Sequence, residues 1–438
     1  MTLIRAAVKN RRRTIANLSL AVFSIALSLL FAEVIARQVV ALDSGTSFLY
    51  RVPDPVLGWV LEPNASYRNV MPETTVRVTY SSLGLRDVEH QFEKSKGVFR
   101  ILVLGDSFME GYSVELGEAF HRRIEDIAAT RGLNVETINL GVGGYGTLQQ
   151  HLSYSSIGKL FNPDLVLLGF LTANDVRNNS RELESLVTED TLKIQARPYL
   201  DLSESGMWTI TQVDYEGALE SYARAKAERD SFWHRMKRSS AVLKTTLDAG
   251  GEVKVVARKA INKVERVLND KQQTNGSFEA EPRTETVHRQ DEAMFGESFC
   301  EEPEIISTAW ETTGTIIERL SIDIRAQGTE FVVFSVPSMR NVESNEMERI
   351  ERALGERNLA CFEQAPANER LGRMLTVLDV MFVDLLPTFR VASREEKKLL
   401  FRFSDKHWNL EGHDLAARKV FTELEQASLL PRWGDAAN

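Results

Sequence analysis

The sequence has few cysteines and no excess of positive charge, and each shortage disfavours a class of protein. Only Cys300 and Cys361 are present, and no C-x-x-C pair occurs, so neither a zinc ribbon nor a redox dithiol is indicated. An even cysteine count is compatible with an oxidising compartment, and both one disulfide and two separate buried thiols remain open. The net charge of −9 disfavours nucleic acid as a partner, because phosphates bind basic surfaces. Nothing in the sequence calls for a metal ion or a cofactor.

Basic residues gather at the N-terminus, ahead of an apolar run. Residues 1–14 contain five basic side chains and no acidic one, and Ile15 to Ala32 has neither charge nor proline. Such a run is about the minimum for a helix that crosses a bilayer. We predict a cytoplasmic segment over 1–14, an uncleaved transmembrane helix over 15–36 of the inner membrane, and an extracytoplasmic or periplasmic remainder. A signal peptide cleaved after Val34-Ile35-Ala36 is the alternative.

Short apolar runs alternate with helical stretches through much of the remaining chain. This alternation predicts βαβ units and a parallel sheet covered by helices on both faces. A helix from about Gly412 to Gln426 is expected at the end. The predicted strands are Arg100–Gly105, Val135–Leu140, Asp164–Leu171, Thr329–Val336 and Leu378–Leu385.

A long insertion divides this predicted α/β core. Ala, Lys, Arg and Glu with intermittent apolar residues predict two amphipathic helices in Gly217–Leu268, joined near Gly250-Gly251. Gln272 to Arg289 is polar and expected to be mobile. The insertion is interpreted either as a cap beside the site or as a surface elaboration. The predicted divisions after the membrane segment are a leading subdomain (41–97), the first part of the core (98–180), the mostly helical insertion (181–304) and the second part of the core (305–430).

Polar residues follow the first three predicted strands, where open parallel sheets bind ligands. Ser107 is a possible nucleophile, Gly144 offers a backbone N–H, and Asn174 offers a side-chain amide. These groups can attack a carbonyl and hold the resulting oxyanion. Asp405 and His407, just ahead of the final helix, supply a base and a carboxylate to orient it. Asp106 or Asp405 could instead cap a helix.

Four segments together resemble the SGNH, or GDSL-type, hydrolase superfamily, in the order that its members show. The resemblance implies a flavodoxin-like three-layer sandwich with about five parallel strands. It further implies Ser107 as nucleophile, His407 as base, Asp405 as its orienting acid, and Ser107, Gly144 and Asn174 as oxyanion donors. The spacing departs from many members, because Asp405 and His407 are two apart rather than three, which leaves His413 a minor candidate. The segments are GDSFMEG (Gly105–Gly111), NLGVGGYGT (Asn139–Thr147), GFLTANDV (Gly169–Val176) and SDKHWNLEGH (Ser404–His413).

The leading subdomain adds to this resemblance without adding chemistry. DPVLGWVLEPN (Asp54–Asn64) and SSLGLRD, together with the N-terminal segment, are similar to membrane-tethered bacterial members. One interpretation of Trp59, Arg86 and Asp87 is that they line the site. The favoured one is that Trp59 packs in the interior and that Arg86 and Asp87 form an ion pair in a turn.

We therefore expect a serine esterase that hydrolyses O-acyl esters, chiefly O-acetyl, on a cell-envelope or secreted glycan. A polysaccharide O-acetyltransferase with the same triad is the alternative, since Asp405 to Trp408 matches the Asp-x-His-Trp of such enzymes. In the acetyltransferases of the alginate type, however, the Asp-x-His-Trp motif precedes the GDS segment, whereas here it follows. Two other classes are a dinucleotide-binding oxidoreductase, because Gly141–Gly146 fits G-x-G-x-x-G, and a glycan-binding protein without activity. The sequence does not indicate an oligomeric state.

Overall fold

A five-stranded parallel sheet lies at the centre of the larger of two units of the chain. The computed structural model describes residues 17, 19–33, 50–188, 196–202, 207–211, 213–229, 283–354 and 360–431. The larger unit comprises 45–69, 73–225 and 281–438, and the smaller comprises 1–44, 70–72 and 226–280. The strands are β5 (Phe99–Leu104), β6 (Val135–Asn139), β7 (Leu165–Phe170), β10 (Glu330–Ser335) and β11 (Met381–Val383).

The strand order confirms the predicted α/β class. The sheet runs β11-β10-β7-β5-β6 with every neighbouring pair parallel. Counted along the chain from the β6 edge, this is the order 2-1-3-4-5 of flavodoxin-like folds. In such sheets the direction of winding reverses between the first and third strands, here β5 and β7, and ligands bind beyond their carboxyl ends.

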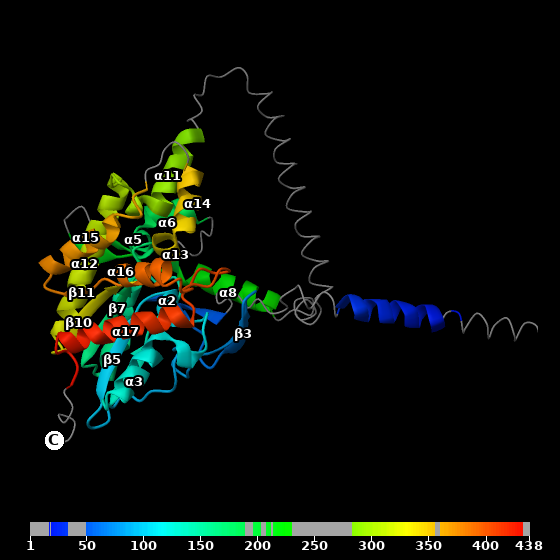
Figure 1. The fold of residues 1–438 in the computed structure, drawn as a ribbon, viewed down its shortest axis with the longest axis horizontal. Helices are drawn as coiled ribbons and strands as arrows, with labels where there is room; N and C mark the ends of the chain where they lie inside the picture. The colour runs from blue at the N-terminus through cyan, green and yellow to red at the C-terminus, as the bar shows by residue number, and fades with distance from the viewer. Residues whose placement is uncertain are drawn as a thin grey trace, which may run out of the picture. The chain divides into compact units, whose positions relative to one another are not determined.

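Helices cover both faces of the sheet, as Figure 1 shows. Alternate strand residues point to opposite faces, so Ile101 and Val103 pack in one apolar cluster and Leu102 and Leu104 in another. The first cluster includes α3 (Phe120–Thr130) and α17 (Leu410–Gln426). The second includes α4 (Thr147–Ser156), α12 (Glu304–Arg325) and α15 (Pro366–Val377). Other helices of the larger unit are α2 (Ser107–Glu110), α5 (Asp175–Asn178), α6 (Arg181–Val187), α13 (Met339–Val342), α14 (Ser344–Leu354) and α16 (Leu386–Arg390).

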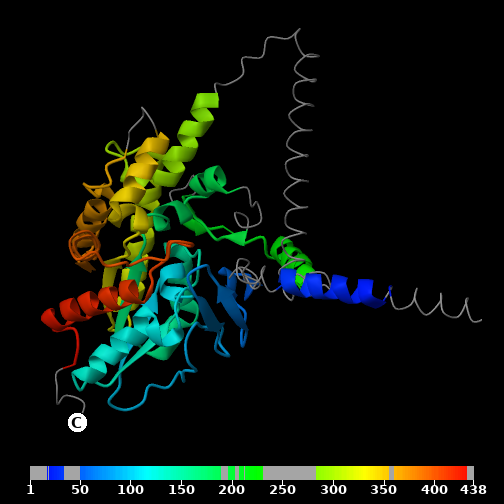
Figure 2. The same cartoon turned by 45° about the vertical axis from the view of Figure 1, so that its right-hand side comes forward.

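Two small antiparallel hairpins precede the sheet and belong to the leading subdomain, which is described from residue 50 onward. They lie beside the β5–α3 part of the chain in Figure 2. The pairs are β1 (Arg51–Asp54) with β2 (Gly58–Leu61), and β3 (Ser66–Val70) with β4 (Thr75–Thr79). Trp59 is buried, as predicted.

The insertion is described only in part. Within the predicted helical stretch, α8 (Tyr215–Arg229) is present, and the stretch from 230 onward, with Gly250-Gly251, lies outside the described residues. A third hairpin pairs β8 (Leu200–Leu202) with β9 (Trp208–Ile210). The last part of the stretch predicted to be mobile belongs to α11 (Arg283–Phe295), in which Arg289 pairs with Glu182 of α6 at 2.6 Å, and residues 272–282 lie outside the described ranges.

One disulfide joins Cys300 to Cys361, which decides between the two alternatives that the sequence left open. The Cα atoms are 4.9 Å apart, and the two cysteines are 61 positions apart along the chain. The Cys361 N–H also donates to the Ser298 carbonyl at 2.6 Å. The bridge therefore ties the start of α12 to the segment before α15.

Residues 19–33 of the smaller unit are helical, and their large apolar side chains are exposed. Across the described ranges, no helix combines the length and the apolar composition needed to cross a bilayer. The predicted membrane segment 15–36 includes residues outside those ranges at both ends.

Candidate active site

Ser107 stands at the turn between β5 and α2, at the winding reversal of the sheet. The strand that leads to it is almost fully buried, so the position of the turn is fixed by packing. Asp106 is the N-cap of α2, since its Oδ1 accepts the Phe108 N–H at 2.9 Å. The aspartate of the Gly-Asp-Ser segment thus has a structural role, and the serine follows it as the first helical residue.

His407 reaches this serine from the far end of the chain. Its Nε2 lies 2.7 Å from the Ser107 Oγ, which is hydrogen-bonding distance for proton transfer. The ring also contacts Phe108, with ring centroids 4.7 Å apart. The adjoining Trp408 is fully buried and donates from its indole Nε1 to the Pro337 carbonyl at 3.0 Å. This tryptophan fixes the loop that presents the histidine.

Asp405 lies beside the other ring nitrogen of His407, despite the short spacing. Its Oδ2 is 3.5 Å from Nδ1, while Oδ1 accepts the His407 backbone N–H at 3.1 Å. Nδ1 is also 3.0 Å from the Asp405 carbonyl oxygen. The two-residue spacing is therefore accommodated by a tight turn in which the carboxylate folds back onto the following residues.

The two groups shift each other's pKa in the sense that favours an ion pair. Burial by itself lowers the pKa of His407, but the hydrogen bond and charge of Asp405, with the charge of Asp106, raise it above its ordinary value. Burial raises the pKa of Asp405, and contact with His407 more than reverses this, so the carboxyl pKa is lowered. The imidazolium that forms when His407 accepts a proton is thereby stabilised.

Tyr112 is a neighbour of the base that the sequence reasoning missed. Its hydroxyl lies 3.2 Å from Nδ1 and 3.4 Å from Nε2 of His407. Burial, followed by the charge of Asp405, raises the pKa of this phenol well above its ordinary value, so it is uncharged. The signal in the sequence was Gly111, since a glycine predicts a turn at the end of a helix. In the structure its left-handed backbone ends α2, and Tyr112 follows it.

The predicted oxyanion donors lie in loops that contact the nucleophile turn. The Asn174 amide donates to Asp106 Oδ2 at 3.0 Å, which leaves its second N–H for another acceptor. The loop of Gly144 is joined to the same turn, because the Val142 N–H donates to the Gly105 carbonyl at 3.3 Å. The Ser107 N–H is at a helix start, where backbone donors have no partner within the helix.

His413, the minor candidate, lies away from the serine. Its ring is buried, and Nδ1 accepts the Phe120 N–H at 3.2 Å. Burial, with the charge of His121 next, lowers the pKa of His413 to about 3. This neutral ring is part of the packing between α17 and α3, as its predicted position on the final helix suggested.

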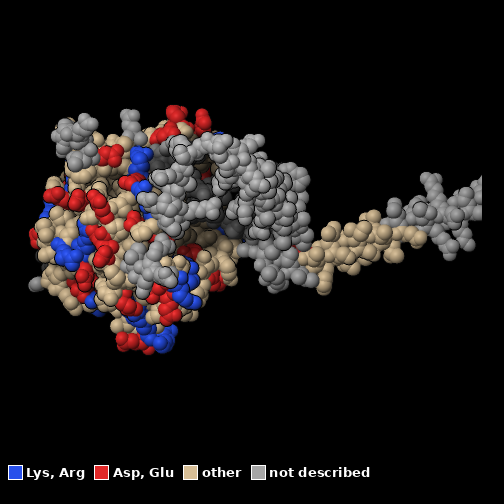
Figure 3. All heavy atoms as spheres, turned by 90° about the horizontal axis from the view of Figure 1, so that it is seen from above, with Lys and Arg blue, Asp and Glu red and all other residues tan. Residues whose placement is uncertain are grey.

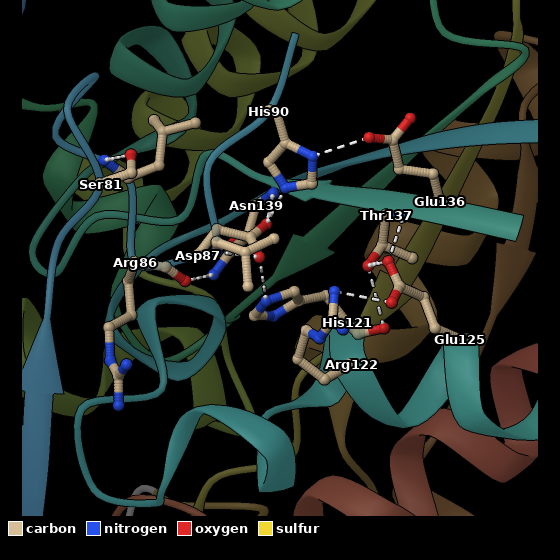
Figure 4. Close-up of polar contacts among 12 residues, drawn as sticks. Ser81, Arg86, Asp87, His90, His121, Arg122, Glu125, Glu136, Thr137 and Asn139 are labelled. Atoms are coloured by element: carbon tan, nitrogen blue, oxygen red, sulfur yellow. Dashed lines mark hydrogen bonds and ion pairs between the residues drawn. The ribbon is translucent and has the colours of Figure 1, made fainter. Parts of the chain in front are cut away.

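A buried polar cluster of Asp87, His90, His121 and Asn139 contacts the start of the glycine loop, and Figure 4 shows these residues. Asp87 lies 3.1 Å from His90 Nε2 and 3.3 Å from His121 Nε2, and accepts the Asn139 N–H at 3.0 Å. Asn139 in turn accepts the Gly141 N–H at 2.9 Å and donates to the Met109 carbonyl at 2.8 Å.

The predicted ion pair between Arg86 and Asp87 is replaced by these contacts. Arg86 donates to the carbonyls of Arg77 and Val114, at 3.3 and 3.2 Å. Asp87 is buried and lies against His90 and His121 instead. Within the described ranges, no group of three or more His, Cys, Asp or Glu side chains has an arrangement that could hold a metal ion.

Comparison with known proteins gives only remote likenesses. No protein-family model matches the chain, and no curated protein matches it. Among solved structures, the chain is similar to an acetyl xylan esterase, AlAXEase, at 9% identity and a TM-score of 0.36, over 74% of this chain and 100% of that one. The lipase/acylhydrolase from Enterococcus faecalis gives 10% identity and a TM-score of 0.35, over 75% and 96% of the chains. TesA gives 8% identity and 0.34, over 76% and 99%. Because these values are low, the proposals below rest on the chain's own strand order and contacts.

Proposed function

We propose that the chain is a serine ester hydrolase of the SGNH type, with Ser107, His407 and Asp405 as its triad. The observation that carries this proposal is the 2.7 Å contact between Ser107 Oγ and His407 Nε2 at the winding reversal of a flavodoxin-like sheet. The nucleophile, its base and the acid beside the base come from two distant parts of the chain. Their meeting at the edge of the sheet where ligands bind supports a catalytic role over a structural one.

In the proposed reaction, His407 takes the proton of Ser107 as Oγ bonds to the ester carbonyl carbon. The carbonyl oxygen becomes an oxyanion, held by the N–H groups of Ser107 and Gly144 and the free amide hydrogen of Asn174. When the C–O bond breaks, His407 gives the proton to the departing alcohol. Water then attacks the acyl-serine, losing a proton to His407, and the carboxylic acid leaves as Ser107 recovers its proton.

The proposed substrate is an O-acetyl ester on a cell-envelope or secreted glycan. This class follows the sequence resemblance to membrane-tethered members and the N-terminal segment. We propose that residues 15–36 form an uncleaved membrane helix with the N-terminus in the cytoplasm. The catalytic domain then faces the side of the membrane where such glycans are found.

The test is hydrolysis of 4-nitrophenyl acetate and of an acetylated oligosaccharide by the full chain in detergent. The wild type should release free acetate, while Ser107→Ala should lose roughly 1000-fold or more of the rate, as removal of a nucleophile does. Ser156→Ala, an exposed serine on α4, is the matched control and should keep full activity. Equal rates in Ser107→Ala and the wild type would refute the proposal. Acetate transferred to the oligosaccharide, with little in solution, would make the enzyme an acetyltransferase.

A further inference from the structure

Gly143, the residue before the proposed oxyanion donor Gly144, is held on both sides. Its N–H donates to Glu110 Oε2 at 2.7 Å, and its carbonyl accepts the Trp59 indole N–H at 3.4 Å. A Cβ at position 143 would lie 2.2 Å from Arg51 Nη2 and 3.0 Å from Glu110 Oε2. Only glycine therefore allows the guanidinium and the carboxylate to approach this backbone.

The contact with Trp59 determines where the Gly144 N–H points. The Gly143 carbonyl and the Gly144 N–H belong to one planar trans peptide, in which the two bonds point in opposite directions. Since the carbonyl faces the Trp59 indole, the Gly144 N–H faces away from it. Gly144 itself has a φ of +80°, a left-handed backbone that glycine adopts without strain.

Glu110 is a costly group to bury, and its carboxylate has an ion-pair partner and hydrogen-bond donors. The side chain has no exposed surface, and its Oε2 lies 3.3 Å from Arg51 Nη2 while Oε1 accepts the Tyr80 hydroxyl at 3.0 Å. A buried carboxylate without such partners would be strongly destabilising. With them, the bond from the Gly143 N–H is charge-assisted, and such bonds are roughly twice as strong as neutral ones.

Trp59 is also held in place by specific contacts. Its carbonyl accepts the Tyr145 hydroxyl at 2.5 Å, and the Arg197 guanidinium lies 5.1 Å from the centroid of its ring. Arg51, Trp59 and Tyr80 all come from the leading subdomain, while Glu110 belongs to the nucleophile helix α2. The subdomain thus contacts the glycine loop and the nucleophile helix together.

We propose that Glu110 and Trp59 are positioning residues of the oxyanion hole, which clamp Gly143 so that the Gly144 N–H is aimed at the reacting carbonyl oxygen. This inference rests on the proposed function, because it acts through Gly144. It also gives the leading subdomain a role in catalysis. Neither residue contacts the substrate, so their loss should weaken transition-state stabilisation and leave substrate binding nearly unchanged.

The first test is Glu110→Gln, which keeps the size of the side chain and an acceptor oxygen but removes the charge. We expect kcat for 4-nitrophenyl acetate to fall by roughly 10- to 100-fold, less than the loss of a whole oxyanion donor, with KM within about twofold. The rate at which a phosphonate ester modifies Ser107 should fall in parallel, since that reaction also builds negative charge on an oxygen in the hole. Glu115→Gln is the control, a glutamate that accepts the exposed Arg77 N–H at 2.9 Å.

The second test is Trp59→Phe, which keeps an aromatic ring but removes the N–H that binds the Gly143 carbonyl. A severalfold fall in kcat with unchanged KM is expected, and this variant decides the matter if Glu110→Gln does not fold. Wild-type kcat in both variants would overturn the inference while the wild type still hydrolyses esters. So would a rise in KM alone, or a fall in kcat matched by the loss of folded protein in thermal melts. An inactive wild type would instead refute the proposed function.

Discussion

His407 and His413 lie in one short segment of the chain, yet only His407 contacts the serine. His413 is neutral and buried, and accepts the Phe120 N–H. We therefore predict that His407→Gln removes nearly all ester hydrolysis, while His413→Gln, which keeps an acceptor, retains most of it. Initial rates, corrected for folded protein by thermal melting, provide the measurement. The opposite ranking of the two variants would reassign the base.

The pH dependence of hydrolysis should follow the protonation of His407. His407 must be neutral to take the serine proton, and its pKa is raised because Asp405 outweighs the effect of burial. The plot of kcat/KM against pH should therefore rise through a pKa above the ordinary histidine value of about 6.5. In Asp405→Asn this pKa should fall along with the rate. An unchanged pKa in that variant would show that Asp405 does not act on the base.

Candidate site residues that lie in short characteristic segments could be picked out from the sequence, and residues that depend on distant partners could not. Ser107, Asp405 and His407 occur in short segments with characteristic neighbours, and the structure brings them together. Glu110 gave no such signal, because a glutamate on a short helix ordinarily faces solvent. Its partners Arg51, Tyr80 and Gly143 come from three other segments, and only the folded chain shows them together.

At the scale of elements, the buried cluster of Asp87, His90 and His121 joins the segment before β5 to α3 and to the end of β6. Burial raises the pKa of Asp87, and the two histidines more than reverse this, so its pKa is lowered. Burial lowers the pKa of His90, but Asp87 and then Glu136 raise it above its ordinary value. The Asp87 contribution to stability is thus present above about pH 4 and is lost as pH falls below that. The His90 contribution is present below about pH 6.5 and is lost as pH rises through the raised pKa.

We predict that the free energy of unfolding of the wild type falls between pH 6.5 and pH 8, and falls less in Asp87→Asn. The asparagine removes the charge that holds the proton on His90 but keeps an acceptor for the Asn139 N–H. Urea unfolding at pH 5, 6.5 and 8 measures this. Asp126→Asn is the control, since this exposed carboxylate pairs with Arg123 on the surface of α3. The same pH dependence in Asp87→Asn and the wild type would contradict the assignment.

The boundaries of the elements show where sequence patterns stop being informative. The buried strand β5 was predicted to within one residue at each end, because its apolar run stops at Gly105. The last strand, β11, is shorter than the predicted Leu378–Leu385, since Leu378 caps α15 and Asp379 adopts a left-handed turn. The final helix begins at Leu410, before the predicted Gly412, because the Asn409 side chain accepts the Gly412 N–H at 3.0 Å.

At the scale of the whole molecule, the proposed membrane helix leads to a fractionation test. The full chain should stay with the membrane fraction after a high-salt wash, and a reporter fused after Asn438 should be active only in a form that requires export. Salt should not release the protein, because an apolar helix is held by the hydrophobic effect rather than by charge. A shortened form in the soluble fraction would indicate a cleaved signal peptide. A reporter signal from inside the cell would contradict the orientation.

On the side seen in Figure 3, the described surface of the larger unit has no cluster of basic side chains that would indicate a polyanionic partner. Basic and acidic side chains are interspersed there. A protein that neutralises several phosphates needs its basic groups together. Whether Cys300 and Cys361 form a disulfide or stay as two separate thiols could not be deduced from the sequence, since the folded chain alone shows that they lie together.

The long chain separation between Ser107 and His407 has a consequence for synthesis. The hydrogen bond between them joins positions 300 residues apart, and β5 with its nucleophile turn is made long before the loop that carries the base. A nascent or truncated chain that ends before Phe403 contains the serine, Gly144 and Asn174 but lacks both the base and the acid. Under the proposed mechanism, Ser107 gains its base only when the segment Ser404–His413 has been made and α17 has packed against α3, so we expect hydrolysis only from chains that include that segment.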